Sequence, residues 1–404
     1  MNSELGVEGS EVAGSMVVRF LALMVAILTV PLVLSCNGDD AIQVSSLSEG
    51  RWGHTATLLK DGRLLVVGGK EKPYGSLGTT EIFDPSTNKW SSAGSTLEPR
   101  GEGHTATLIG NGVLITGGTD SALAEIYDLS TDQWLLAGTM LDARLWASAT
   151  LLEDGRVLVA GGEDATVTGS KELASAEIYD PSTGEWTATN SMNEAHSGHS
   201  ATLLNGRPLL VGRYSAEIYD PYTETWSSAG QPVRERRVGS TATVLNDERV
   251  LVTGGEWLNG GFLQGDKGGG LYSAGAMGTG HGSEGKNPRI HLPIIEPLHE
   301  VEIYDPLTGE WSETTGMSEG RIHHSAILLD DGRVLVVGSR TLEARDPDTG
   351  AWSSVGKLSQ EHGEFYTATL LKDGRILIVG GRSKTDESFQ GLSYVETYDM
   401  SAEP

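Results

Sequence analysis

Arginine and histidine recur along this chain in a pattern that could build a binding site. Five arginines each stand three or four positions before a histidine or a small residue. Guanidinium and imidazole groups gathered at one place could bind an anionic ligand or a sugar. The residues of this pattern that we take as candidate binding groups are Arg51, His54, Arg100, His104, His199, Arg237, Arg321 and His324.

A recurrent glutamate offers these arginines a second, structural role. Buried Arg–Glu pairs would hold repeated units in register and would not contact a ligand. Because a residue kept in most copies of a repeat is usually structural, we favour this interpretation of the arginines. The glutamates are Glu81, Glu125, Glu177, Glu217, Glu302, Glu343 and Glu396.

Residues that break the repetition are more informative about a binding site. Trp146, Arg213 and Trp257 are further candidate binding groups of this kind. An exposed tryptophan could stack on a sugar ring, although each of these residues could equally be packing. Other residues that break the pattern are Trp52, Glu102, Tyr214, Arg234, Glu364 and Phe365.

No arrangement typical of catalysis accompanies these residues. The chain shows no Ser-His-Asp order, no paired carboxylates and no His-Glu-x-x-His motif. His281, His291 and His299 could ligate a metal together with Glu296, but their spacing is irregular. We therefore predict no catalytic residue, no cofactor and no metal site.

Charge and cysteine content exclude several kinds of partner and site. The 404 residues include 29 Lys and Arg against 55 Asp and Glu, which gives a net charge of −26. Such a surface repels phosphate backbones, so we exclude nucleic acid as a partner. A single cysteine, Cys36, excludes a disulfide framework and any Cys-rich zinc site. We expect a monomer.

An apolar run near the start, from Phe20 to Leu34, is too short for a comfortable membrane span and is typical of a targeting signal. The run leads into Val33-Leu34-Ser35-Cys36, which resembles the lipobox of bacterial lipoproteins. In that family the cysteine receives a lipid and becomes the mature N-terminus. We interpret residues 1–36 as this signal segment, with Met16 as the better start. The alternative is an ordinary cleaved signal in which Cys36 is accidental.

From residue 41 onward, one unit of four short segments occurs seven times. Thr55 to Leu59 is predicted as a strand, Asp61-Gly62 as a tight hairpin turn, and Leu64 to Val67 as a strand buried on both faces. A segment such as Ala176-Glu177-Ile178-Tyr179 supplies a third strand, and an Asp-Pro-x-Thr-Gly turn leads to a fourth that opens on Trp. A sheet that is apolar on both faces needs a neighbour on each side, and the radial stacking of a β-propeller provides them.

The Gly68-Gly69 pair, the Glu-x-Tyr-Asp strand and the regularly spaced tryptophans are similar to kelch repeats. The resemblance covers nearly all of residues 41–404 and implies an all-β, seven-bladed kelch-type propeller with four antiparallel strands per blade. Kelch propellers include galactose oxidase and a sialic-acid epimerase, so the resemblance admits a sugar enzyme as well as a binding module. The copper oxidase type needs a cysteine cross-linked to tyrosine. Because Cys36 lies in the signal segment, we exclude that chemistry for the mature chain.

The last copy stops after its third strand, before a tryptophan strand. Counting back from Arg51 by the spacing of the other copies leads to Ala41–Leu47, which has strand character. We predict that this N-terminal strand completes the last blade and removes an exposed edge. Residues 37–404 would then form a single domain, joined to the lipid by a short tether.

Connection lengths distinguish the two ends of the predicted propeller. Turns between the first and second strands, and between the third and fourth, are uniform, whereas the other connections vary widely. The longest is a glycine-rich insert at 256–300 in the fifth copy, which we expect to be a flexible lid or a partly disordered loop. Because length variation concentrates where binding loops lie, we place ligand contacts at this variable end.

Together these patterns predict an extracytoplasmic, membrane-anchored propeller that binds a protein or glycan at its variable end. Its predicted location is the periplasm or the cell surface of a bacterium. The alternative is a carbohydrate-active enzyme, epimerase- or oxidase-like, that lacks the copper Cys–Tyr site. We expect binding without catalysis.

Overall fold

The structure, a computed structural model, describes residues 41–73, 75–167, 171–234, 238–259, 294–384 and 388–400. Residues Gly38–Pro404 form one compact unit. No helix in the described ranges is long and apolar enough to cross a membrane. The predicted signal segment, with Cys36, lies outside the described residues.

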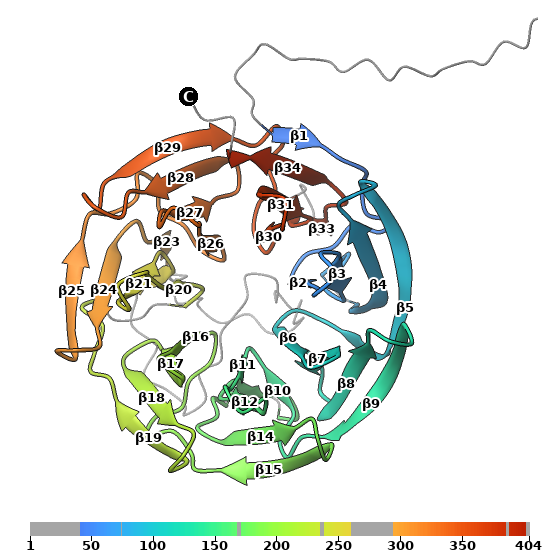
Figure 1. Ribbon diagram of the computed structural model, residues 1–404, viewed down its shortest axis with the longest axis horizontal. Coiled ribbons are helices and arrows are strands. Elements are labelled where there is room, and N and C mark those ends of the chain that lie inside the picture. Colours follow the sequence, from blue (N-terminus) through green and yellow to red (C-terminus); the bar gives the residue numbers. More distant parts are fainter. Residues whose placement is uncertain are drawn as a thin grey trace, which may run out of the picture. The chain divides into compact units, whose positions relative to one another are not determined.

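Seven four-stranded antiparallel sheets are arranged around one axis as the blades of a propeller (Figure 1). The first three blades are β2 (Thr55–Leu58), β3 (Leu64–Val67), β4 (Leu77–Asp84) and β5 (Lys89–Arg100); β6 (His104–Ile109), β7 (Gly112–Gly117), β8 (Leu123–Asp128) and β9 (Gln133–Thr139); and β11 (Ser148–Leu151), β12 (Val157–Ala160), β14 (Ala176–Asp180) and β15 (Glu185–Thr189). The fourth and fifth are β16 (Ser200–Leu204), β17 (Arg207–Val211), β18 (Ala216–Asp220) and β19 (Thr225–Ser228); and β20 (Thr241–Val244), β21 (Val250–Thr253), β24 (Val301–Asp305) and β25 (Glu310–Thr314). The last two are β26 (Ser325–Leu328), β27 (Val334–Val337), β28 (Thr341–Arg345) and β29 (Trp352–Lys357); and β30 (Thr367–Leu370), β31 (Arg375–Val379), β34 (Val395–Asp399) and β1 (Ala41–Gln43).

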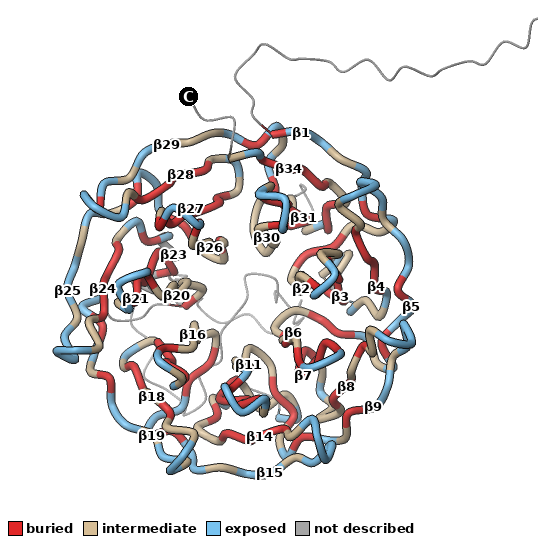
Figure 2. The backbone as a smooth tube through the Cα atoms, viewed as in Figure 1, coloured by how far each residue is buried: buried red, intermediate tan, exposed pale blue. Residues whose placement is uncertain are grey.

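The second strand of each blade is the core of the fold, as its unbroken apolar sequence predicts. All four residues of β3 are buried. Leu64 and Val66 pack in one cluster with residues of the seventh blade, and Leu65 and Val67 pack in another with residues of the second. Successive side chains of a strand point to opposite faces, so one strand fills both of its interfaces. Figure 2 shows the buried residues concentrated in the middle strands and the exposed ones in turns and outer strands.

The recurrent tryptophan ties each of the first six blades to the one before it. It stands on the outer strand, opposite the tyrosine or phenylalanine of the third strand where one is present, and its indole N–H donates to a backbone carbonyl of the preceding blade's outer segment. An indole needs such a partner when it is half-buried. The bonds are Trp90 to Ser45 (2.8 Å), Trp134 to Ala93 (3.0 Å), Trp186 to Ala137 (2.8 Å), Trp226 to Asn190 (2.9 Å), Trp311 to Ala229 (2.8 Å) and Trp352 to Thr315 (2.9 Å).

The N-terminal strand closes the ring, which confirms the predicted closure. β1 pairs with β34 in antiparallel register, and Ala41 lies opposite Tyr398, where other blades have the tryptophan. The strand proper covers Ala41–Gln43; beyond it, Leu47 is buried between the seventh and first blades. Closure leaves no blade with a missing outer strand.

Three short two-stranded sheets extend from the blades at the variable end. They are β10 (Arg144–Leu145) with β13 (Glu163–Asp164), β22 (Glu256–Asn259) with β23 (Ile294–Pro297), and β32 (Arg382–Lys384) with β33 (Phe389–Gly391). The second of these forms the two ends of the predicted insert at 256–300. The part of the insert for which we predicted a flexible lid, including His281 and His291, lies outside the described residues.

Candidate ligand-binding site at the channel mouth

The recurrent glutamates hold the links between blades. Each lies on a third strand and accepts a backbone N–H from the segment that precedes its own blade's inner strand. The bond gives every link the same anchor, which is why the residue recurs in all seven copies. The donors are Ser48 to Glu81, Leu97 to Glu125, Leu141 to Glu177, Asn193 to Glu217, Val233 to Glu302, Ser318 to Glu343 and Ser359 to Glu396.

Buried arginines pair with four of these glutamates, as the structural interpretation predicts. The pairs are Arg51–Glu81 (3.0 Å), Arg100–Glu125, Arg144–Glu177 (3.0 Å) and Arg321–Glu343. Two further blades use histidine in place of arginine, in His196–Glu217 (3.3 Å) and His362–Glu396 (3.4 Å).

This burial removes three predicted binding groups from any ligand. Arg51 and Arg100 are 0% exposed and Arg321 is 5% exposed. Their guanidinium groups also donate hydrogen bonds to backbone carbonyls. For example, Arg51 donates to the carbonyl oxygen of Gly68 at 3.0 Å. The structure places these arginines inside the scaffold and not on a binding surface. Arg237 lies outside the described residues.

Four histidines at the start of inner strands bridge neighbouring blades. In each, Nε2 shares a hydrogen bond with a hydroxyl of the preceding blade: His54 with Thr367 (3.0 Å), His104 with Thr55 (3.0 Å), His199 with Ser148 (2.9 Å) and His324 with Thr253 (2.8 Å). Burial lowers the pKa of His104 to about 4 and that of His199 to about 3, and it holds the pKa of His54 well below its usual value. At neutral pH the imidazoles of His54, His104 and His199 are therefore uncharged bridges.

The same four imidazoles line a cavity of about 290 Å³ at the variable end of the central channel. Each blade contributes two consecutive residues to the lining, at or just before the start of its inner strand, and the four histidines belong to these pairs. The seven pairs are Gly53 and His54, Gly103 and His104, Trp146 and Ala147, Gly198 and His199, Gly239 and Ser240, His323 and His324, and Phe365 and Tyr366. This cavity is the one place where the predicted histidines and Trp146 meet.

The first member of every pair adopts the left-handed backbone conformation. In four blades it is glycine, which takes a positive φ without cost. In three it is a large aromatic residue, Trp146 (φ 57°), His323 (φ 48°) or Phe365 (φ 59°). A left-handed backbone costs a non-glycine residue about 1–2 kcal/mol, so the fold holds three strained aromatic residues where glycine would serve.

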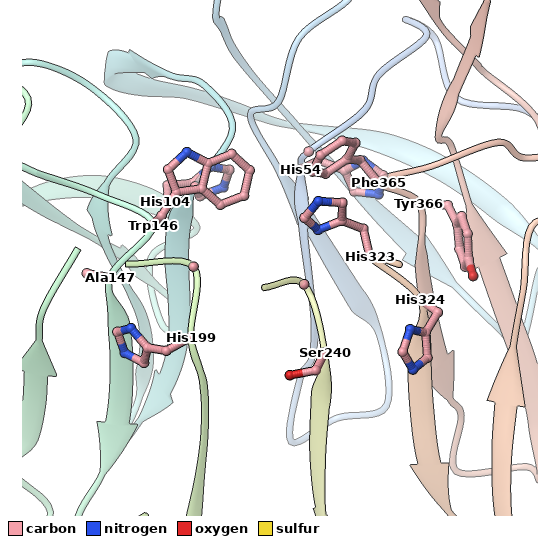
Figure 3. Close-up of a pocket in the computed structure, with 14 residues that line it drawn as sticks. His54, His104, Trp146, Ala147, His199, Ser240, His323, His324, Phe365 and Tyr366 are labelled. Atoms are coloured by element: carbon pink, nitrogen blue, oxygen red, sulfur yellow. The ribbon is translucent and has the colours of Figure 1, made fainter. Parts of the chain in front are cut away.

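These three residues, which we call the aromatic cluster, converge from the third, sixth and seventh blades. The rings of His323 and Phe365 stack with centroids 4.0 Å apart, and Trp146 lies 6.2 Å from His323 and 5.9 Å from Phe365. Figure 3 shows the cluster at the outer end of the cavity, with His199, Ser240 and His324 deeper along the inner strands. Glycine makes room for the rings, since a Cβ at Gly103 would lie 2.9 Å from Trp146.

Two cations of the chain already stack on aromatic rings beside the cluster. The Arg382 guanidinium lies 4.7 Å from the Phe365 ring centroid and 5.2 Å from that of Trp52, and it pairs with Glu364. Lys70 lies 5.3 Å from the Trp52 centroid and pairs with Glu102 at 2.8 Å. Burial, followed by the charge of Arg382, lowers the pKa of His323 to about 3, so this imidazole is neutral.

The remaining predicted binding groups, Arg213 and Trp257, are not part of the cavity lining. Arg213 is half-buried, with Nε and Nη2 unpartnered. Trp257 belongs to β22. Arg234, by contrast, is paired with Glu313 at 2.9 Å.

Sequence reasoning missed one residue of the aromatic cluster, His323. His324 stands at the histidine position of the repeat, whereas His323 stands where four other copies have glycine. The sequence signal for the cluster is that Trp146, His323 and Phe365 replace this glycine in the other three copies.

Comparison with known proteins agrees with this architecture. Residues 39–213 match the family model of the KLHDC2/KLHL20/DRC7 Kelch-repeats domain. No curated protein matches the chain. Among solved structures, a fungal alcohol oxidase of the AA5 family, determined in complex with copper, is 16% identical with a TM-score of 0.65. The alignment covers 89% of this chain and 76% of the oxidase, and at this identity it shows a common fold alone.

The partial family match and the seven blades together support a kelch-repeat β-propeller. Within the described ranges, no group of three or more His, Cys, Asp or Glu side chains is placed to hold a metal ion. The mouth offers aromatic faces, buried hydrogen-bonding imidazoles and surrounding charge.

Proposed function

We propose that this kelch-repeat β-propeller is a protein-interaction module that binds its partner at the mouth of the central channel. One observation carries the proposal: the aromatic cluster occupies left-handed backbone positions at which four sister blades have glycine. Strain that a glycine would relieve is typical of functional sites. Partly exposed aromatic side chains are also the groups that contribute most to protein interfaces.

The scaffold supports this role because the blades hold the cluster from opposite sides of the channel. Buried pairs fix the three links that carry the cluster: Arg144–Glu177 before Trp146, Arg321–Glu343 before His323 and His362–Glu396 before Phe365. A rigid platform loses little conformational freedom when a partner binds.

We further propose that the protein is exported and anchored by a lipid at Cys36, as the residues before it indicate. The partner would then be a periplasmic or cell-surface protein. A glycan partner is the competing outcome, because an exposed tryptophan also stacks on sugar rings.

The test replaces all three cluster residues with glycine, the residue that the other four blades have at this position. The triple variant is Trp146→Gly, His323→Gly and Phe365→Gly. The matched control is Tyr222→Ser in the β18–β19 turn at the other end, where Tyr222 is 86% exposed and the third blade has Ser182. Chemical cross-linking in cells should capture the same proteins with wild type and control, and lose them with the folded triple variant. Unchanged capture by the triple variant would refute the proposal. Capture of glycans alone on a glycan array would replace the protein partner with a sugar.

A further inference from the structure

The imidazole bridges around the channel are interrupted between the fourth and fifth blades. Each bridge joins a histidine to the hydroxyl on the first residue of the preceding blade's inner strand. The pairs are His54 and Thr367 (3.0 Å), His104 and Thr55 (3.0 Å), His199 and Ser148 (2.9 Å), and His324 and Thr241 (3.3 Å). The fifth blade has Ser240 at the histidine position, and the first inner-strand residue of the fourth blade is Ser200.

Ser200 and Ser240 have no such bridge. The Oγ atoms of both are buried, and neither has a hydrogen-bond partner among the described residues. The backbones of these two blades are nevertheless connected as elsewhere: the Gly239 N–H donates to the Gly198 carbonyl at 3.4 Å, as the Gly198 N–H donates to that of Trp146 at 3.1 Å. Because a serine side chain lacks the ring with which histidine spans this interface, two unpaired hydroxyls remain where an imidazole lies at the equivalent interfaces.

The two other blades without histidine at this position satisfy their polar groups in other ways. In the seventh blade Tyr366 takes the position, and its hydroxyl donates to the Val337 carbonyl. In the third blade the position is Ala147, and the hydroxyl of Thr105 in the preceding blade is hydrogen-bonded to that of Thr116 at 2.7 Å. Within the described residues, the interface between the fourth and fifth blades is therefore the one that leaves both hydroxyls unpaired.

This gap opens into the cavity at the channel mouth, because Ser240 belongs to the cavity lining. Figure 3 shows the Ser240 side chain between those of His199 and His324, with its hydroxyl on the side away from His324. The lining contains no Asp, Glu, Lys or Arg. A charged group placed here would be buried without an opposite charge in the lining, which is costly.

We propose that this gap, which we call the serine notch and define by Ser200 and Ser240, binds an uncharged planar group with hydrogen-bonding atoms, of the size of an imidazole. The inference rests on the proposed function and names a group that the partner inserts at the mouth. Each hydroxyl can donate one hydrogen bond and accept others, and a buried hydroxyl without a partner costs free energy that such a group restores. A neutral histidine side chain or a carboxamide has this chemistry, whereas an aliphatic side chain leaves both hydroxyls unpaired.

The test uses imidazole itself as the probe, at about pH 8.5, where the ring is neutral. Thiophene is the comparison, since it is a five-membered aromatic ring without a nitrogen. In ligand-observed NMR with the full-length protein, we expect imidazole to bind roughly fivefold more tightly than thiophene, which corresponds to about one hydrogen bond. A second arm uses acetyl-Gly-His-Gly-amide: tighter binding than imidazole assigns the group to a partner's side chain, weaker binding assigns it to a free heterocycle, and both results support the notch.

Variants of the two serines test where the probe binds. Ser240→His should restore the bridge to Ser200, raise Tm by about 2 °C and exclude imidazole from the notch. The double variant Ser200→Ala with Ser240→Ala keeps the space without the hydroxyls, and should lower the affinity for imidazole to that for thiophene. Ser182→Ala, an equal loss of a hydroxyl in the exposed β14–β15 turn, should leave binding of both probes unchanged.

Equal affinity of the wild type for imidazole and thiophene overturns this inference, as does an unchanged affinity for imidazole in the double variant. Neither result touches the proposed function, which is decided by whether the triple glycine variant loses its cross-linked partners.

Discussion

Replacing His104 with glutamine should make the stability of the propeller less dependent on pH. In the folded chain the imidazole is 6% exposed, and burial lowers its pKa from 6.5 to about 4. In the unfolded chain the same group titrates near its ordinary value. Below pH 6.5 the unfolded state therefore takes up a proton that the folded state refuses, and stability falls as the pH drops toward 4.

The size of the effect follows from the two pKa values. Each pH unit between them removes up to about 1.4 kcal/mol, so His104 alone should cost about 2 kcal/mol of unfolding free energy between pH 7.5 and pH 5. Glutamine does not titrate in this range. The variant should be less stable than wild type at pH 7.5, because it loses the bridge to Thr55, and should lose about 2 kcal/mol less on acidification.

Urea unfolding at pH 7.5 and pH 5, monitored by tryptophan fluorescence, measures the loss of unfolding free energy on acidification in the variant and in wild type. Tyr222→Ser, which removes no titrating imidazole and lies at the other end of the blades, should track wild type at both pH values. If His104→Gln and wild type lose the same free energy on acidification, His104 is not held neutral by burial, and the bridging role assigned to these histidines is wrong.

Four further outcomes test the scaffold and the proposed lipid anchor. Deleting residues 41–43 should lower Tm sharply in thermal melts, since it strips β34 of its outer pairing partner; an unchanged Tm would mean that the ring closes another way. Glu125→Ala leaves the Arg100 guanidinium buried without its carboxylate and should cost about 3–5 kcal/mol in urea unfolding, whereas Asp61→Ala, at an exposed pair, should cost less than about 1 kcal/mol. Replacing 260–293 with a short Gly-Asn linker should change stability by no more than about 1–2 kcal/mol, because Asn259 and Ile294 are already paired; a larger loss in the same assay would make the insert part of the core. Cys36→Ala should abolish labelling by a fatty-acid probe, and persistent labelling would exclude lipidation there.

Repetition made the fold predictable from sequence. Seven copies of one pattern specify seven blades, and the missing tryptophan strand after Asp399 specifies how the ring closes. The binding site was harder to predict, because the sequence does not show how deeply a recurrent polar side chain is buried. Arg51 and His54 are three positions apart, yet the guanidinium is buried behind the strand while the imidazole lines the cavity.

The aromatic cluster marks a second limit of sequence reasoning. Its defining property is a positive backbone φ. The sequence indicates such a φ only indirectly, through the glycines at the same position in the other four copies. Trp146 and Phe365 could be singled out as departures from the pattern, but nothing in their identity showed that they meet His323 across the channel. Convergence from three blades is a property of the closed ring.

The pairing of β1 with β34 also governs the order in which the molecule can be completed. A ribosome delivers the chain from its N-terminus, so the first strand of the propeller emerges before any other and has no partner waiting. Ala41–Gln43 can pair only after Val395–Asp399 has followed it, near the end of the described chain. Throughout synthesis the growing propeller therefore stays an open arc, and the last step of folding pairs β1 with β34.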